Sequence, residues 1–177
     1  MREFYVKMME KDYSHSNQIK SAFKKKENAL IFETFSADII SLSLGGTQND
    51  GMMREGPSAS VTRKALDMGI FVVAAAGNDG GLDDDGRVSV PSNVARAISV
   101  GASIRGGAVW ENSSLGSQIM PNGDERNNPN MKPEIIAPGE GIISTGRGDS
   151  WYSSSGTSDA TVFVTAALAL ILEDQPR

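Results

Sequence analysis

The sequence predicts an α/β domain with a doubly wound, mainly parallel sheet and helices on both of its faces. Strand-like and helix-like segments alternate along the chain, which is the order of elements in such domains. Residues 70–76 are apolar throughout, and continuous apolarity indicates a strand that is buried on both faces. Gly45 and Asn78 follow two predicted strands, at the carboxyl ends where parallel sheets carry their sites.

The first strand and helix are predicted near the N-terminus. Residues 4–9 are β-prone and alternate in polarity, whereas residues 16–35 place apolar side chains mostly at helical spacing. Residues 37–44 predict the next strand. It stops at Gly45 and Gly46, where the lack of a side chain lets backbone or ligand approach closely.

A helix and two further strands are predicted in the middle of the chain. Pro57 suits the first turn of the helix, and Gly69 ends it. The predicted buried face of this helix consists of Val61, Ala65, Leu66 and Met68. The strand at 70–76 follows, and a second β-prone segment lies at 97–101.

The C-terminal part predicts loops, one short strand and a long helix. Residues 106–130 are rich in Gly, Asn, Ser and Pro, so they predict loops with short strands. Residues 135–139 form a short apolar strand that a turn stops. A polar segment, 151–155, then gives way at Gly156 to the apolar residues 160–172, which suffice for about three helical turns.

Length and composition indicate one domain, residues 1–177, with a single sizeable core. The 39% hydrophobic and 22% charged residues are typical of a soluble globular protein, and no apolar run is long enough to span a membrane. A net charge of −5 argues against nucleic acid as a partner, because phosphate binding needs clustered Lys and Arg. The absence of cysteine excludes disulfides and a cysteine nucleophile but leaves the cellular compartment open.

Ser158 lies at the predicted start of the last helix. Unpaired backbone N–H groups and the positive end of the helix dipole favour negative charge there, so its hydroxyl could act as a nucleophile with a stabilised oxyanion. A simpler interpretation is that Thr157 or Ser158 only caps the helix.

Four segments, in this order along the chain, carry a resemblance to a known family. They are residues 37–46, 69–80, 132–139 and 156–158. Together they resemble the C-terminal part of the subtilisin-like serine protease domain, and the likeness extends over most of the chain. The resemblance implies a single partial domain of this fold, cut at both ends relative to the family.

The resemblance also implies functional roles. Ser158 matches the family's nucleophile, and Asn78 matches its side-chain donor to the oxyanion, with the Ser158 backbone N–H as second donor. The implied substrate-binding residues are Ser43, Leu44 and Gly45 on one side of a cleft, and Ala75, Ala76 and Gly77 on the other. An extended peptide or protein substrate would pair with backbone there, and the small second segment leaves room for a large apolar side chain. Without the family, these glycines and Asn78 are ordinary turn residues.

The family's catalytic Asp and His precede its Ser, and their motifs lie upstream of the segment that residues 4–7 resemble. The only histidine, His15, lacks the family's His-Gly-Thr context, so we expect it to be a surface residue and not the base. We therefore expect a serine endopeptidase part that is inactive alone, with a partner segment that supplies Asp and His, or with self-association. The alternative is a non-catalytic peptide-binding or interaction module.

Two acidic features remain. Asp159 replaces a Met of the family beside the nucleophile; a carboxylate there repels the oxyanion unless it points away, or else favours the helix N-terminus. Residues 83–86 cluster oxygen ligands of the kind that calcium takes, but their spacing fits no complete calcium loop. The predicted reaction requires no cofactor, and calcium is an optional ligand.

Two other enzyme classes fit the sequence poorly. An α/β-hydrolase has a Gly-x-Ser-x-Gly turn after an apolar strand and a histidine after its serine, whereas here the approach to Ser158 is polar and no histidine follows. A dinucleotide-binding fold could use residues 77–81, but the Gly-x-Gly-x-x-Gly spacing is absent.

Overall fold

The computed structural model of this protein describes residues 37–46, 57–83, 86–117 and 131–174. The elements in chain order are β1 (Ile39–Leu42), α3 (Pro57–Asp67), β2 (Phe71–Ala75), the 3-10 turn η2 (Gly81–Asp83), β3 (Ile98–Ser103), β4 (Gly116–Ser117), β5 (Met131–Lys132), β6 (Ile135–Pro138), β7 (Ile142–Thr145), β8 (Trp151–Ser154) and α4 (Thr157–Asp174). The strand predicted at 4–9, the helix predicted at 16–35 and His15 lie outside the described residues.

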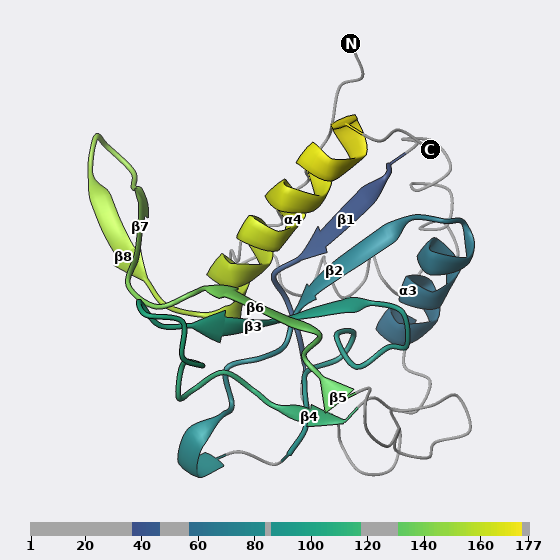
Figure 1. Ribbon diagram of the computed structural model, residues 1–177, viewed down its shortest axis with the longest axis horizontal. Helices are drawn as coiled ribbons and strands as arrows, with labels where there is room; N and C mark the ends of the chain where they lie inside the picture. Colours follow the sequence, from purple (N-terminus) through teal and green to yellow (C-terminus); the bar gives the residue numbers. More distant parts are fainter. Residues whose placement is uncertain (1–36, 47–56, 84–85, 118–130, 175–177) are drawn as a thin grey trace.

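The centre of the fold is a four-stranded parallel sheet in the order β1-β2-β3-β6 (Figure 1). Leu42 of β1 lies opposite Ala74 of β2, and Ala75 of β2 lies opposite Val100 of β3. Parallel neighbours need crossover connections, which is why helices alternate with strands in the sequence. The predicted mainly parallel sheet is confirmed, and each strand predicted between residues 37 and 139 is present.

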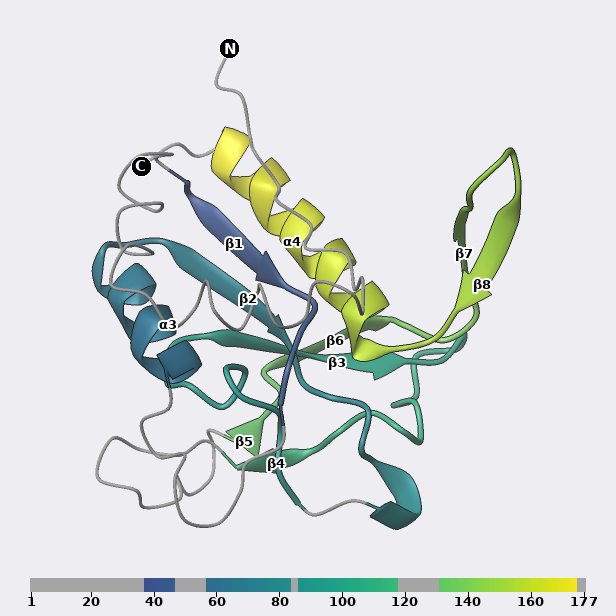
Figure 2. The same cartoon turned by 180° about the vertical axis from the view of Figure 1, so that it is seen from behind.

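Helices α3 and α4 cover opposite faces of this sheet (Figures 1 and 2). Val72 of β2 packs in one cluster with Ala65 of α3, whereas Val73 packs in another with Ala160 of α4. Successive side chains of a strand point to opposite faces, so the two helices must lie on opposite sides of β2. Both valines are fully buried, which explains the continuous apolarity of this strand and confirms the doubly wound arrangement.

Helix α3 begins and ends close to the predicted residues. Pro57 is its first residue, and Gly69 takes the left-handed φ of +81° that turns the chain into β2. The predicted buried face is partly wrong: Met68 is exposed, because the helix ends at Asp67. The buried residues of α3 are Ala59, Thr62 and Ala65.

Helix α4 is apolar over most of its length, but only one side of it is buried. Its buried residues are Thr157, Ala160, Thr161 and Thr165. An exposed apolar row occupies the other side, and we call it the α4 stripe: Phe163, Ala166, Ala167, Leu170 and Ile171. No helix in the described part of the chain is both long and apolar enough to cross a membrane.

Strands β7 and β8 form an antiparallel hairpin that projects from the body of the domain (Figures 1 and 2). Ile142 lies opposite Ser154, and Thr145 lies opposite Trp151. The sequence analysis predicted only a polar approach to the last helix here, so the hairpin is an addition to the predicted elements. A second short antiparallel pair joins β4 to β5.

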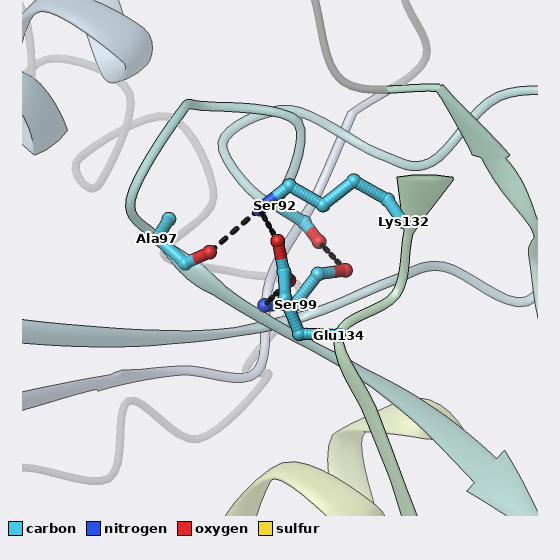
Figure 3. A network of polar contacts seen from close by, with 5 residues as sticks. All are labelled: Ser92, Ala97, Ser99, Lys132 and Glu134. Carbon is cyan, nitrogen blue, oxygen red and sulfur yellow. Dashed lines mark hydrogen bonds and ion pairs between the residues drawn. The ribbon is translucent and has the colours of Figure 1, made fainter. Parts of the chain in front are cut away.

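A buried lysine connects β5 and β6 to the beginning of β3 (Figure 3). The Lys132 ammonium donates to the carbonyl of Ala97 at 2.6 Å and pairs with Glu134 Oε1 at 2.7 Å. The second carboxylate oxygen of Glu134 accepts the Ser99 N–H at 2.7 Å, and the Ser99 hydroxyl hydrogen-bonds with that of Ser92. The buried positive charge is therefore both paired and hydrogen-bonded, as burial of an ammonium requires.

Candidate active site

The site lies where the carboxyl ends of β1 and β2 meet the N-terminus of α4. Ser158 is the second residue of α4, and Ser43 is the first residue after β1. The Ser43 hydroxyl donates to the Ser158 carbonyl at 3.1 Å, and the Ser158 hydroxyl donates to the Ser43 carbonyl in a long hydrogen bond of 3.4 Å. Two segments that are far apart in the sequence are thus held together at the predicted nucleophile.

Asn78 reaches the same helix N-terminus from β2. Its Oδ1 accepts the Thr157 backbone N–H at 2.9 Å and the Thr157 hydroxyl at 3.0 Å. A backbone N–H can only donate, so the carbonyl oxygen of the amide must face Thr157, and Nδ2 remains available as a donor. Nδ2 would lie 3.3 Å from a Cβ built on Gly156, two residues before Ser158. The structure therefore brings Asn78 and Ser158 together, while their catalytic roles stay predictions.

Thr157 is fully buried and joins both predicted cleft segments to the helix. Its hydroxyl donates to Asn78 Oδ1 and accepts the Gly77 N–H at 3.1 Å. Neither this hydroxyl nor that of Ser158 bonds to the free N–H groups of the first turn, so the simple capping interpretation does not hold. The carbonyl of Gly156 accepts the Asp159 N–H at 3.1 Å instead, and the helix starts from there.

Asp159 is held toward the hairpin. The hydroxyl of Ser154, the last residue of β8, donates to Asp159 Oδ1 at 2.7 Å. The carboxylate also lies in the first turn of α4, where the helix dipole favours negative charge. Of the two effects considered from the sequence, stabilisation of the helix N-terminus therefore has structural support.

The two predicted substrate-binding segments continue beyond the ends of β1 and β2, and residues 88–90 lie between them. Val90 exchanges two backbone hydrogen bonds with Gly46, at 3.0 and 3.1 Å, and the Ser89 N–H donates to the Ala76 carbonyl at 2.6 Å. Ala75 and Ala76 are buried, whereas Gly45 is exposed. The sequence analysis missed Ser89, because it belongs to no motif and is brought to the cleft only by tertiary contacts.

The calcium prediction concerns residues 83–86. Asp83 ends the turn η2, but Asp84 and Asp85 lie outside the described residues. Where the structure describes the chain, no three His, Cys, Asp or Glu side chains gather into a group that could hold a metal ion. Calcium binding stays a prediction.

A parallel α/β domain that brings a serine hydroxyl and a side-chain amide to one helix N-terminus has the architecture of a serine peptidase. The chain belongs to the subtilase family, whose sequence pattern matches residues 5–177.

Individual relatives are similar over most of this chain. An intracellular serine protease of Paenibacillus polymyxa is 36% identical over 135 residues, and subtilisin E of Bacillus subtilis (strain 168) is 34% identical over 139 residues. Among solved structures, the patellamide maturation protease PatA superposes with a TM-score of 0.67 at 28% identity, over 84% of this chain. The aligned parts make up only 36% and 32% of the two relatives and 49% of PatA, so this chain spans about a third to a half of their length.

Proposed function

We propose that this chain is the nucleophile-bearing part of a subtilisin-like serine endopeptidase. Ser158 is the nucleophile, and the oxyanion receives hydrogen bonds from Asn78 Nδ2 and from the Ser158 backbone N–H. The observation that carries this proposal is the pair of hydrogen bonds from Thr157 to Asn78 Oδ1, at 2.9 and 3.0 Å. They fix the amide with its donor group free, beside a serine at the positive end of a helix.

In the proposed reaction, Ser158 Oγ attacks the carbonyl carbon of the scissile peptide bond while a base takes the hydroxyl proton. The tetrahedral intermediate carries its negative charge on the former carbonyl oxygen, which the two donors stabilise. Collapse of the intermediate breaks the C–N bond, and the amine leaves with the proton held by the base. Water then hydrolyses the acyl-enzyme by the same steps and frees Ser158.

The base is the part that this sequence does not supply. The hydroxyl of Ser158 donates to the Ser43 carbonyl, a neutral acceptor that cannot take its proton. The single histidine, His15, lacks the family's sequence context. We propose that a further polypeptide segment, carrying the Asp and His motifs of a subtilase, completes the site, whether it belongs to the same polypeptide or to another.

Two features of the structure support a docking place for that segment. Strand β1 forms one edge of the described sheet, where an added strand can pair. The α4 stripe is exposed, with Leu170 at 67% and Ile171 at 57% of their full accessible surface, although helices that are apolar all round are normally buried. The expected occupant is therefore an apolar strand and helix, as the N-terminal part of an α/β domain contains.

The first test uses a fluorescent fluorophosphonate, which labels activated serines. A positioned general base contributes about 10²- to 10⁴-fold, so we expect Ser158 in the purified chain to react slower than a complete subtilase by about that factor. Mass spectrometry would locate the label, and Ser158→Ala is the control. Rapid labelling of Ser158 in the chain alone would show that a base is already present.

The second test adds the Asp- and His-bearing segment, in trans or joined in one polypeptide, and measures cleavage of a quenched fluorescent peptide. We expect cleavage that Ser158→Ala abolishes. Asn78→Ala should lower kcat by about 100- to 1000-fold, a magnitude taken from subtilisin and not from this structure. Peptide binding without cleavage in either format would favour a non-catalytic interaction module.

A further inference from the structure

The side chain of Ser89 lies between two glycines that line the predicted cleft. A Cβ built on Gly45 would come within 2.5 Å of Ser89 Cβ and 2.9 Å of Ser89 Oγ. A Cβ built on Gly77 would come within 2.5 Å of the same Ser89 Oγ. Gly45 and Gly77 belong to opposite walls of the cleft, so one short side chain contacts both walls at once.

Backbone hydrogen bonds fix Ser89 in this place. Its N–H donates to the Ala76 carbonyl at 2.6 Å, and its own carbonyl accepts the Asn93 N–H at 3.1 Å. The next residue, Val90, is buried and bonded to Gly46 on the opposite wall. Ser89 cannot withdraw from the slot between the glycines without breaking these contacts.

The same slot is attached to the reacting groups. One wall carries Ser43, which exchanges hydrogen bonds with Ser158. The other carries Gly77, whose N–H donates to the Thr157 hydroxyl, and it continues into Asn78. A substrate residue with its side chain between Gly45 and Gly77 therefore has its carbonyl group beside Ser158 and Asn78.

We propose that Ser89 closes the floor of this slot and restricts the residue before the scissile bond to a short side chain, such as that of Ala or Ser. The inference rests on the proposed function, because it assigns the substrate class of that same cleft. The expectation of room for a large apolar side chain considered only the small residues of one wall. A benzyl or isobutyl group between the glycines would occupy the volume that Ser89 already fills.

The test measures binding of peptides to the purified 177-residue chain, so it does not need the missing base. Fluorescein-labelled tetrapeptide acids that share three residues and end in Ala, Ser, Leu or Phe would be compared by fluorescence anisotropy. We expect the Ala and Ser peptides to bind at least about tenfold tighter than the Phe peptide, the scale on which apolar pockets discriminate by size.

Two variants separate the floor from its hydroxyl. Ser89→Gly should remove or reverse the preference, because it opens the slot. Ser89→Ala should keep it, because Cβ still lies against Gly45. The same serine-to-glycine change at Ser153, exposed on the hairpin, is the control and should leave the ratio unchanged.

The outcomes distinguish this inference from the function on which it rests. Equal binding of the Ala and Phe peptides, or an unchanged ratio in Ser89→Gly, would overturn the role of Ser89 and leave the peptidase proposal standing. If no peptide binds to any variant, the cleft itself is wrongly assigned, and the inference falls with it.

Discussion

A single hydroxyl, that of Thr157, links the parts of the site that come from different strands. It donates to the amide oxygen of Asn78 and accepts the backbone N–H of Gly77, and the residue is fully buried. The orientation of the Asn78 amide, and with it the direction of the Nδ2 donor, therefore depends on a residue that does not itself react.

This dependence can be measured as stability without any catalytic assay. Thr157→Val keeps the shape of the side chain but leaves the Gly77 N–H without its partner and removes one of two donors to Asn78. We expect the free energy of unfolding in urea to fall by about 1–3 kcal/mol, the cost of unmade hydrogen bonds in a buried site. Thr157→Ser keeps the hydroxyl and should cost less than Thr157→Val. Equal losses in the two variants would mean that the methyl group, and not the hydroxyl, holds the site together.

At the scale of elements, the beginning of β6 depends on the Lys132–Glu134 pair. Lys132 is buried with its ammonium between the Ala97 carbonyl and the Glu134 carboxylate, while the side chain of Glu134 is 41% exposed. Glu134 also accepts the Ser99 N–H of β3. The pair therefore joins the N-terminal ends of two adjacent strands, at the opposite ends from the site.

Breaking this pair should cost more than replacing it. Glu134→Ala leaves a buried ammonium without its counter-charge, and we expect a loss of about 2–4 kcal/mol, just below the range for fully buried pairs because Glu134 is partly exposed. The double variant Lys132→Met, Glu134→Leu removes both charges and should be more stable than Glu134→Ala. Denaturant titration of the single and double variants measures the coupling. Additive losses would show that the two charges do not interact.

The elements also show how far the sequence could predict the structure. Strand β2 was predictable because Val72 and Val73 face two different helices, and burial on both faces leaves a continuous apolar run. The hairpin was not, because Trp151-Tyr152-Ser153-Ser154 does not alternate in polarity and its strands pair mostly isoleucine with serine. Ser158 and Asn78 were predictable from local motifs. Ser89 was not, because its place between Gly45 and Gly77 arises only from the tertiary fold.

At the scale of the whole molecule, the distribution of apolar surface is uneven. The sheet face under α4 is well covered, since Val73, Val100 and Ala102 are buried against it. The opposite side of the same helix exposes the α4 stripe, in which residues 163, 166, 167, 170 and 171 follow helical spacing along one line. Contiguous apolar patches of this kind mark interaction surfaces.

Until the Asp- and His-bearing segment covers it, the α4 stripe should therefore drive self-association of the chain. We expect species larger than the monomer in sedimentation velocity at tens of micromolar, a concentration at which weak apolar interfaces form. Leu170→Glu together with Ile171→Lys should shift the distribution to monomer, because charges in the interface oppose its burial. Leu82→Glu is the matched control: Leu82 is fully exposed but lies on η2, outside the stripe, so this change should leave the association unchanged. A monomeric wild-type chain would mean that the stripe is covered within the chain itself, and the proposed docking place on α4 would have to be abandoned.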